Sequence, residues 1–255
     1  MKKLFLLVGV LVSLAAAQVV FGQATGVINY EVKINLHRNI PPEREAQKAM
    51  IPEFRTTKQQ LFFNASESLY KMVIEDDEES FTSNSGGMRM NFRMPNTELY
   101  LDQNTGQTLS KQEVMGKNYL IVDSVKMAPW KFGTQTKTIA TYECNMAYFT
   151  QTDTIRIGDN EPRIRVAEIT AWYTSAIRPF LGPERFNTLP GAVLAVDINN
   201  GERVILAKSI EMRELKKNEL KAPTSGTRVT QSEFRKIMEE QMKQMGGGRQ
   251  MIIRN

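Results

Sequence analysis

Apolar and polar residues alternate along many short stretches of this chain, and this period of two predicts β-strands. The clearest stretch runs over residues 28–36, where Ile28, Tyr30 and Val32 take turns with polar neighbours. Successive side chains of a strand point to opposite faces, so one face of this strand is expected to be buried and the other exposed.

The same pattern recurs down the chain, with turn residues between the stretches. It predicts further strands at residues 59–64, 68–75, 88–94, 98–102, 107–114, 117–123, 136–140, 144–152, 163–173, 192–198 and 203–210. The last two flank Asn199-Asn200-Gly201, a strong hairpin signal. Many short strands at regular spacing favour a mainly β fold, namely a strongly curved antiparallel sheet or an open barrel.

Two segments are expected to be helical. A short helix follows Pro41-Pro42 over residues 43–50. Near the C-terminus, Thr230 and Glu233 form a possible capping box. An amphipathic helix should follow, with Phe234, Ile237, Met238, Met242 and Met245 on one face.

The N-terminus has the features of a secretory signal. Lys2 and Lys3 precede an apolar run over residues 4–17, and small residues follow it up to Gly22. We therefore expect a signal peptide at 1–22, a β domain at 23–221, and at 222–255 a linker, the amphipathic helix and a mobile tail. The expected location is the periplasm or the outer membrane surface, with no transmembrane span after cleavage.

Composition narrows the function classes. The formal net charge of +5 falls to +3 without Lys2 and Lys3, and the positive residues are scattered. Nucleic acid is therefore not an expected partner. The single cysteine, Cys144, cannot form an intramolecular disulfide, so the core alone must hold the fold.

Several motifs in the second half occur in a recognisable order. They are Trp130, the segment 138–144, Ala171-Trp172-Tyr173-Thr174, Gly182-Pro183 and Leu189-Pro190-Gly191. In these features the chain resembles the GLPGLI family, although the signature segment itself reads Thr188-Leu189-Pro190-Gly191-Ala192-Val193. The resemblance implies an exported envelope protein of a Gram-negative phylum. The biochemical function of the family is unknown, and its members are often associated with outer-membrane transport systems.

The motif has a structural interpretation and a functional one. Pro190 fixes φ and Gly191 would permit a positive φ, which suits a tight turn into the next strand. Alternatively, the turn at Leu189, Pro190 and Gly191 is a rigid loop that presents a partner surface, with Trp172 and Tyr173 as further binding candidates.

Catalytic and metal sites find little support in the sequence. Cys144 and His37 could form a thiol–imidazole pair, but no local motif surrounds either of them. Zinc would need more His or Cys ligands than the chain has. Met88, Met90 and Met94 could bind Cu(I) through their thioethers, although the apolar phase of a strand explains the same spacing.

The leading hypothesis is a non-catalytic binding or accessory protein without a cofactor that serves an outer-membrane transport system. Its partner would be an envelope protein, or a hydrophobic ligand held in the β cup. The alternatives are a Met-rich copper-binding protein and a Cys-dependent hydrolase that uses Cys144.

Overall fold

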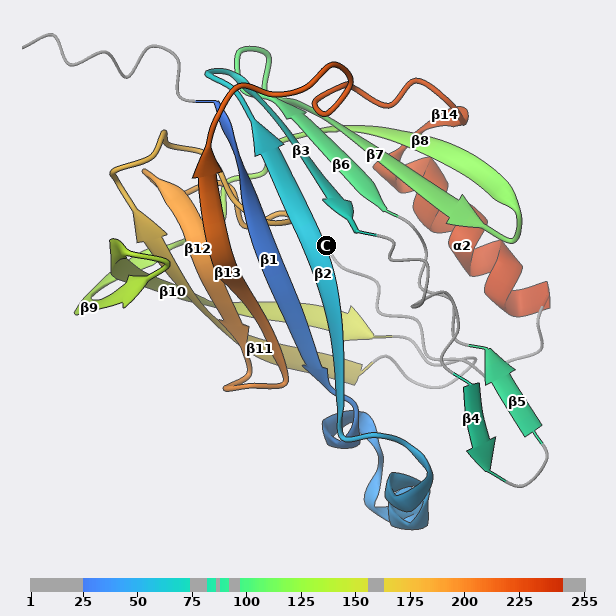
Figure 1. The fold of residues 1–255 in the computed structure, drawn as a ribbon. Coiled ribbons are helices and arrows are strands. Elements are labelled where there is room, and N and C mark those ends of the chain that lie inside the picture. Colours follow the sequence, from blue (N-terminus) through green and yellow to red (C-terminus); the bar gives the residue numbers. More distant parts are fainter. Residues whose placement is uncertain (1–24, 74–81, 86–87, 92–96, 156–162, 245–255) are drawn as a thin grey trace, which may run out of the picture.

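One large β-sheet dominates the computed structural model, which describes residues 25–73, 82–85, 88–91, 97–155 and 163–244 (Figure 1). Its strands are β1 (Gly26–Asn35), β2 (Phe54–Phe63), β3 (Glu67–Met72), β6 (Glu98–Asp102), β7 (Gln107–Val114), β8 (Lys117–Ser124), β9 (Lys131–Ile139), β10 (Tyr142–Ile155), β11 (Arg163–Thr174), β12 (Ala192–Ile198), β13 (Arg203–Met212) and β14 (Thr227–Thr230). A separate hairpin consists of β4 (Thr82–Ser85) and β5 (Met88–Asn91).

The sheet has 12 strands in the order β14-β8-β7-β6-β3-β2-β1-β13-β12-β11-β10-β9. All neighbours are antiparallel except β14 and β8, which are parallel. The sheet curls so strongly that β10 and β11 pass behind β1 (Figure 1). The prediction of a mainly β, strongly curved sheet is confirmed, and the sheet is open because β9 and β14 form its two ends.

Strand register divides the side chains into an inner and an outer face. Across six neighbouring strands the inner row reads Ile28, Leu61, Tyr70, Leu99, Ser110, Ile121. The adjacent outer row reads Val27, Phe62, Leu69, Tyr100, Leu109, Val122. Both rows are largely apolar, so this part of the sheet must be covered on both faces.

The connection between β11 and β12, residues 175–191, covers the inner face, and we call it the plug loop. Its side chains Leu181, Phe186 and Leu189 are at most 1% exposed and lie in the core cluster with Ile28 and Tyr30. The plug loop also extends β12, because the Val193 amide donates to the Leu181 carbonyl at 2.8 Å. The inner face of the sheet is thus filled by the chain itself.

The connection between β13 and β14, residues 213–226, covers the outer face, and we call it the strap. It crosses from the middle of the sheet to the β8 edge, over the ends of several strands (Figure 1). Leu220 and Ala222 of the strap pack on the outer cluster around Tyr100. Thr25 fastens its start, since the Thr25 hydroxyl donates to the Arg213 carbonyl at 2.7 Å and the Arg213 amide donates back at 3.1 Å.

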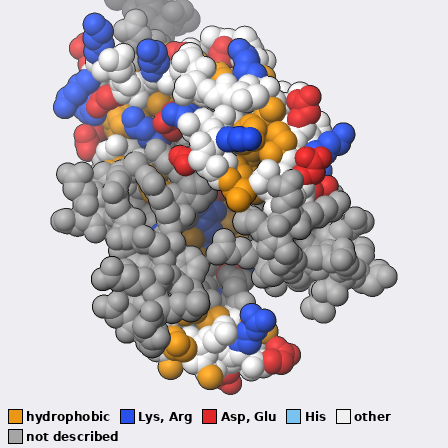
Figure 2. Space-filling model, turned by 90° about the vertical axis from the view of Figure 1, so that its right-hand side faces the viewer, with side chains coloured by type: hydrophobic (Ala, Val, Ile, Leu, Met, Phe, Trp, Pro, Cys, Tyr) orange, Lys and Arg blue, Asp and Glu red, His pale blue; other side chains and the backbone are white. Residues whose placement is uncertain are grey.

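The C-terminal helix α2 (Gln231–Gln244) follows the strap and β14. Its expected capping box is present, because the Glu233 amide donates to Thr230 Oγ1 at 3.2 Å and the Thr230 amide donates to Glu233 Oε2 at 2.7 Å. Phe234 packs edge-on against Tyr119 of β8, with ring centroids 5.6 Å apart, which places α2 on the inner face. On this side of the molecule, hydrophobic side chains reach the surface in one compact area bordered by charged ones (Figure 2).

Two local expectations need correction. The linker expected at 221–227 is followed not directly by the helix but by β14, a strand paired with β8. The early helix is of the 3-10 type, with η1 (His37–Asn39) and a kinked η2 (Pro42–Met50). Of the strand expected at 88–94, the described part is β5, which pairs with β4 outside the main sheet, and residues 92–94 lie outside the described residues. The signal peptide at 1–22, Met94 and the tail from 245 onwards lie outside the described residues.

Candidate functional site

The motif turn Leu189-Pro190-Gly191 joins the plug loop to β12. Leu189 is fully buried, and Pro190 is exposed. The expected positive φ at Gly191 is wrong, because the glycines with positive φ are others. Glycine is required here for space instead: a Cβ at Gly191 would lie 2.2 Å from the Thr174 carbonyl oxygen. The turn therefore holds β11 and β12 in close backbone contact.

Polar contacts anchor the plug loop at both of its ends. The Trp130 indole Nε1 donates to the Thr188 hydroxyl at 2.9 Å, beside the motif turn. At the start of the loop, Arg178 donates to the Glu67 carbonyl at 2.9 Å and to Gln103 Oε1 at 2.7 Å. Arg178 thereby ties the plug loop to turns of the distant strands β3 and β6.

Arg178 is a buried cation whose acceptors are neutral. Its side chain is 6% exposed, and burial lowers its pKa to about 10. No carboxylate of the described residues offsets this shift, and Nε has no hydrogen-bond partner among them. A buried charge of this kind is costly unless its hydrogen bonds hold it, so Arg178 has a structural function in joining two parts of the sheet.

Trp172 and Tyr173, the other binding candidates, point to opposite faces of β11. Trp172 is half-buried on the outer face, with the Lys137 ammonium 4.1 Å from its ring centre. Desolvation lowers the pKa of Lys137. Tyr173 is half-buried on the inner side and meets the exposed Phe132 of edge strand β9 edge-on. The two residues therefore cannot form one binding surface.

The outer face of β10 and β11, which also carries Trp172, has exposed apolar side chains at several positions along the two strands. Register places Met146 opposite Trp172 and Thr152 opposite Val166. Ile164 is 72% exposed, Val166 54% and Tyr148 41%. In the part of the chain that the structure describes, no element packs over these side chains. We call Tyr148, Ile164, Val166 and Trp172 the outer apolar face.

The thiol–imidazole pair is not assembled. Cys144 lies near the start of β10, whereas His37 follows the end of β1, and β13, β12 and β11 lie between these two strands in the sheet. Burial raises the pKa of the Cys144 thiol to about 11, and the residue is fully buried. His37 Nε2 lies 2.7 Å from the Ile51 carbonyl oxygen. The thiolate needed for nucleophilic attack is therefore strongly disfavoured.

The methionine hypothesis stays a prediction. Met88 and Met90 belong to β5, where they lie opposite Ser85 and Ser83, and Met94 is outside the described residues. Within the described ranges, no three or more His, Cys, Asp or Glu side chains are grouped so as to hold a metal ion. That finding concerns harder ligands and does not test thioethers.

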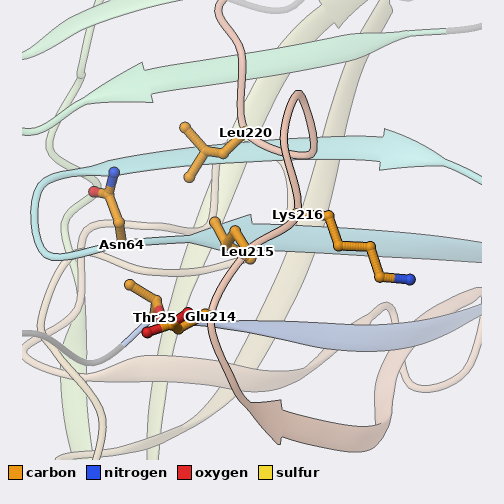
Figure 3. Close-up of a pocket in the computed structure, with 6 residues that line it drawn as sticks. All are labelled: Thr25, Asn64, Glu214, Leu215, Lys216 and Leu220. Atoms are coloured by element: carbon orange, nitrogen blue, oxygen red, sulfur yellow. The ribbon is translucent and has the colours of Figure 1, made fainter.

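A shallow pocket of about 410 Å³ lies between the strap and the sheet (Figure 3). It is lined by Thr25, Asn64, Glu214, Leu215, Lys216 and Leu220. Asn64 Oδ1 already accepts the Ser66 and Glu67 amides, and the Thr25 hydroxyl is bonded to the strap. The Lys216 side chain points away from the other five residues (Figure 3). The pocket therefore offers few polar groups to a ligand.

Comparison with known proteins places the chain near a family of unknown function. Residues 130–195 match the model of a family described as "Protein of unknown function (Porph_ging)". This segment spans β9, β10, β11, the plug loop and the start of β12, so it contains both the motif turn and the outer apolar face. Comparison with curated protein sequences finds no match.

Two solved structures of PNGF-II share the fold. In space group C2 the TM-score is 0.55 at 14% identity, covering 86% of this chain and 33% of PNGF-II. In space group P21 the TM-score is 0.54 at 14% identity, covering 85% and 33%. The chain thus spans about a third of the length of the structures it matches. At this identity the likeness concerns the fold alone.

Several residues of the site could not be singled out from the sequence. Tyr148, Ile164 and Val166 follow a strand pattern that does not say which face is covered. Arg178 lies in a loop, and its partners are 75 and 111 residues away. Among the described residues, no helix is long and apolar enough to cross a membrane.

Proposed function

We propose that this protein is an exported, non-catalytic binding or accessory protein of the cell envelope that holds an outer-membrane protein on its outer apolar face. The supporting observation is the exposure of Tyr148, Ile164 and Val166 along the outer face of β10 and β11, the face on which Trp172 also lies. Burying one such aliphatic side chain contributes about 1.5–3 kcal/mol. Several of them together would provide the core of a specific interface, with Lys137 at its border.

A protein partner fits this geometry better than a hydrophobic ligand. The inner face, where a β cup would hold a lipid, is filled by Leu181, Phe186 and Leu189 of the plug loop. The outer face is a strand surface that side chains of another protein can cover. The location rests on the N-terminal signal features, and an outer-membrane partner rests on the resemblance to GLPGLI proteins.

In vivo photo-crosslinking tests the proposal. A photoreactive amino acid replaces Ile164 or Val166 in the full chain, and the control replaces Glu113, which is exposed on β7. We expect one outer-membrane protein to be cross-linked from both test positions and not from the control. With the photoreactive amino acid at residue 164, Val166→Asp should weaken the adduct strongly without lowering Tm, because Val166 is exposed.

Two results would contradict the proposal. The first is an adduct of twice the chain mass, which would identify a second copy of this protein as the occupant. The second is an identical set of products from residues 164, 166 and 113, which would show that the outer apolar face has no preferred partner.

A further inference from the structure

Strand β9 forms one end of the sheet and is exposed along most of its length. In the described part of the chain, β10 is its only strand neighbour. Lys131, Phe132 and residues 134–138 are exposed, and only Ile139 is buried. The strand lies at one side of the molecule, beside the β10 face that carries Tyr148 (Figure 1). An edge strand of this kind presents backbone groups with which another strand can pair.

The hairpin turn after β9 shows which backbone groups face the free edge. A two-residue loop at 140–141, with positive φ at both positions, joins Ile139 to Tyr142. In such a hairpin the residues that flank the loop exchange both hydrogen bonds, and bonded and non-bonded pairs then alternate along the ladder. Counting back from this pair, Thr136 and Thr138 direct their N–H and C=O groups away from β10, toward the free edge.

The outer side of this edge is positively charged. Lys131 lies opposite Tyr148 of the outer apolar face, and the Lys137 ammonium lies over the Trp172 ring. Neither lysine forms an ion pair with a carboxylate of the described residues. No residue between 125 and 142 is acidic. A strand added at this edge would therefore meet two ammonium groups on its outer side.

The inner side of the same edge carries an apolar side chain. Phe132 lies opposite the core residue Ala147. It is 61% exposed, although its ring meets Tyr173 edge-on with centroids 6.2 Å apart. Side chains of an added strand would alternate between the two sides of the sheet. Acidic residues of that strand could thus face the lysines while an apolar residue covers Phe132.

A second copy of this chain does not suit the edge. Pairing β9 with β9 would bring the lysines of two copies together with no carboxylate between them, and like charges in neighbouring strands are destabilising. A bulge also interrupts the ladder, because residues 133–135 stand against Met146 alone. Lysines and bulges protect an edge from indiscriminate pairing. The same lysines attract a segment that carries carboxylates, so the charge selects the partner.

We infer that β9 binds an extended acidic segment of the protein partner by strand addition, with carboxylates of that segment on Lys131 and Lys137. Thr136 and Thr138 provide the backbone hydrogen bonds, and the side chains on either side set which segment fits. The inference rests on the proposed function, since the same partner would cover the outer apolar face next to this edge. It adds a contact through the backbone, which the apolar side chains of β11 do not supply.

Photo-crosslinking in cells tests the edge, with the photoreactive amino acid at Thr138 of the full chain. We expect an adduct with the same protein that is cross-linked from Ile164. Mass spectrometry of the adduct should locate the cross-link in an acidic segment of that protein. Lys131→Glu should reduce the yield of the Thr138 adduct about tenfold, because an attractive charge pair becomes a repulsive one, whereas Lys131→Arg should preserve it.

Proline substitutions distinguish strand addition from ordinary surface contact. Thr136→Pro removes an N–H that faces the free edge, so the Thr138 adduct should be lost while Tm changes little. Lys137→Pro is the matched control, since it removes an N–H that is bonded to β10 and should lower Tm.

The outcomes separate this inference from the proposed function. If Ile164 is cross-linked to an outer-membrane protein and Thr138 is not, the strand addition is wrong and the proposed function stands. An absence of adducts at both positions overturns both. The strand addition is also wrong if Thr136→Pro or Lys131→Glu keeps the wild-type Tm and the full Thr138 adduct, or if that adduct has twice the chain mass.

Discussion

The two halves of the sheet are covered on different faces by different connections. In the half from β9 to β13, the plug loop fills the inner face with Leu181, Phe186 and Leu189, and the outer face of β10 and β11 keeps its exposed side chains. In the half from β2 to β8, the strap covers the outer face through Leu220 and Ala222. At the far edge, α2 adds cover to the inner face of β8.

We relate this difference to two tasks: the plug loop stabilises the fold, and the uncovered outer face is the proposed partner surface. The plug loop lies inside the segment that matches the family model, and its buried residues belong to the largest core cluster. The strap lies outside that segment, and its side chains on the outer cluster, Leu220 and Ala222, are half-buried. The half with the deeper core is also the half with the uncovered outer face, so its rigidity can support a partner surface.

Truncating one leucine in the plug loop and one in the strap should give the largest difference in stability loss. Leu189→Ala removes a fully buried side chain and should lower the free energy of unfolding by about 2–5 kcal/mol. Leu220→Ala removes a half-buried one from the strap and should cost about 1 kcal/mol. Chemical denaturation measures both. Equal losses would mean that the strap is as integral to the core as the plug loop.

The next largest loss of stability should follow from removing Arg178, whose hydrogen bonds link the two halves. Arg178→Ala leaves the Glu67 carbonyl and Gln103 Oε1 without their donor and should cost about 2–3 kcal/mol. Arg178→Met loses the same hydrogen bonds but also removes an uncompensated buried charge, so it should lie closer to the wild type. Urea unfolding compares the three proteins. An unchanged stability in Arg178→Ala would show that the halves do not depend on this contact.

Local sequence patterns predicted the strands well, but they did not predict which connections pack over the faces of the sheet. The strands at 98–102, 107–114 and 192–198 match β6, β7 and β12 to the residue, because turn residues bound them closely. The pairing of β1 with β13 joins residues about 180 positions apart, which no local pattern encodes. Which face each connection covers depends on this strand order. The sequence alone therefore could not show that the plug loop and the strap pack over the sheet.

The candidate site shows the same limit at single residues. The sequence singled out Gly191 for the right position but the wrong reason, since the Thr174 carbonyl and not a positive φ excludes a side chain there. The contact between Arg203 and Glu184 and the buried Tyr70 hydroxyl were not predicted. They depend on the path of the plug loop across the inner face, which only the folded chain defines.

A smaller loss should follow when the second anchor of the plug loop is removed. The Trp130 ring packs edge-on against Phe149 with centroids 4.6 Å apart. Trp130→Phe retains a smaller aromatic ring at this position but loses the hydrogen bond to Thr188. The expected cost is about 1 kcal/mol in thermal unfolding. Thr188→Val should cost a similar amount, and the double variant should show less than the sum. Fully additive losses would mean that the two side chains do not act together.

The smallest effect is expected in the strap and should disappear in acid. Hydrogen bonds from Arg213 at 2.8 Å lower the pKa of Glu219 to about 2. In the unfolded chain a glutamate titrates near pH 4.3. Because the folded pKa is the lower one, the contact stabilises the fold above that pH, and its contribution is lost as the pH falls toward 2. Solvent screening keeps it small.

Glu219→Gln should therefore cost a little stability at pH 7, and its difference from the wild type should shrink between pH 4.5 and 2, so that the acid limb of the stability profile becomes flatter. Denaturant unfolding at a series of pH values measures this, with Glu113→Gln as the control for a glutamate exposed on β7. If both variants leave the acid limb as steep as in the wild type, Arg213 does not hold the strap through Glu219. The strap would then depend on Leu220, Ala222 and the Thr25 contacts alone, and its difference from the plug loop would be one of apolar burial only.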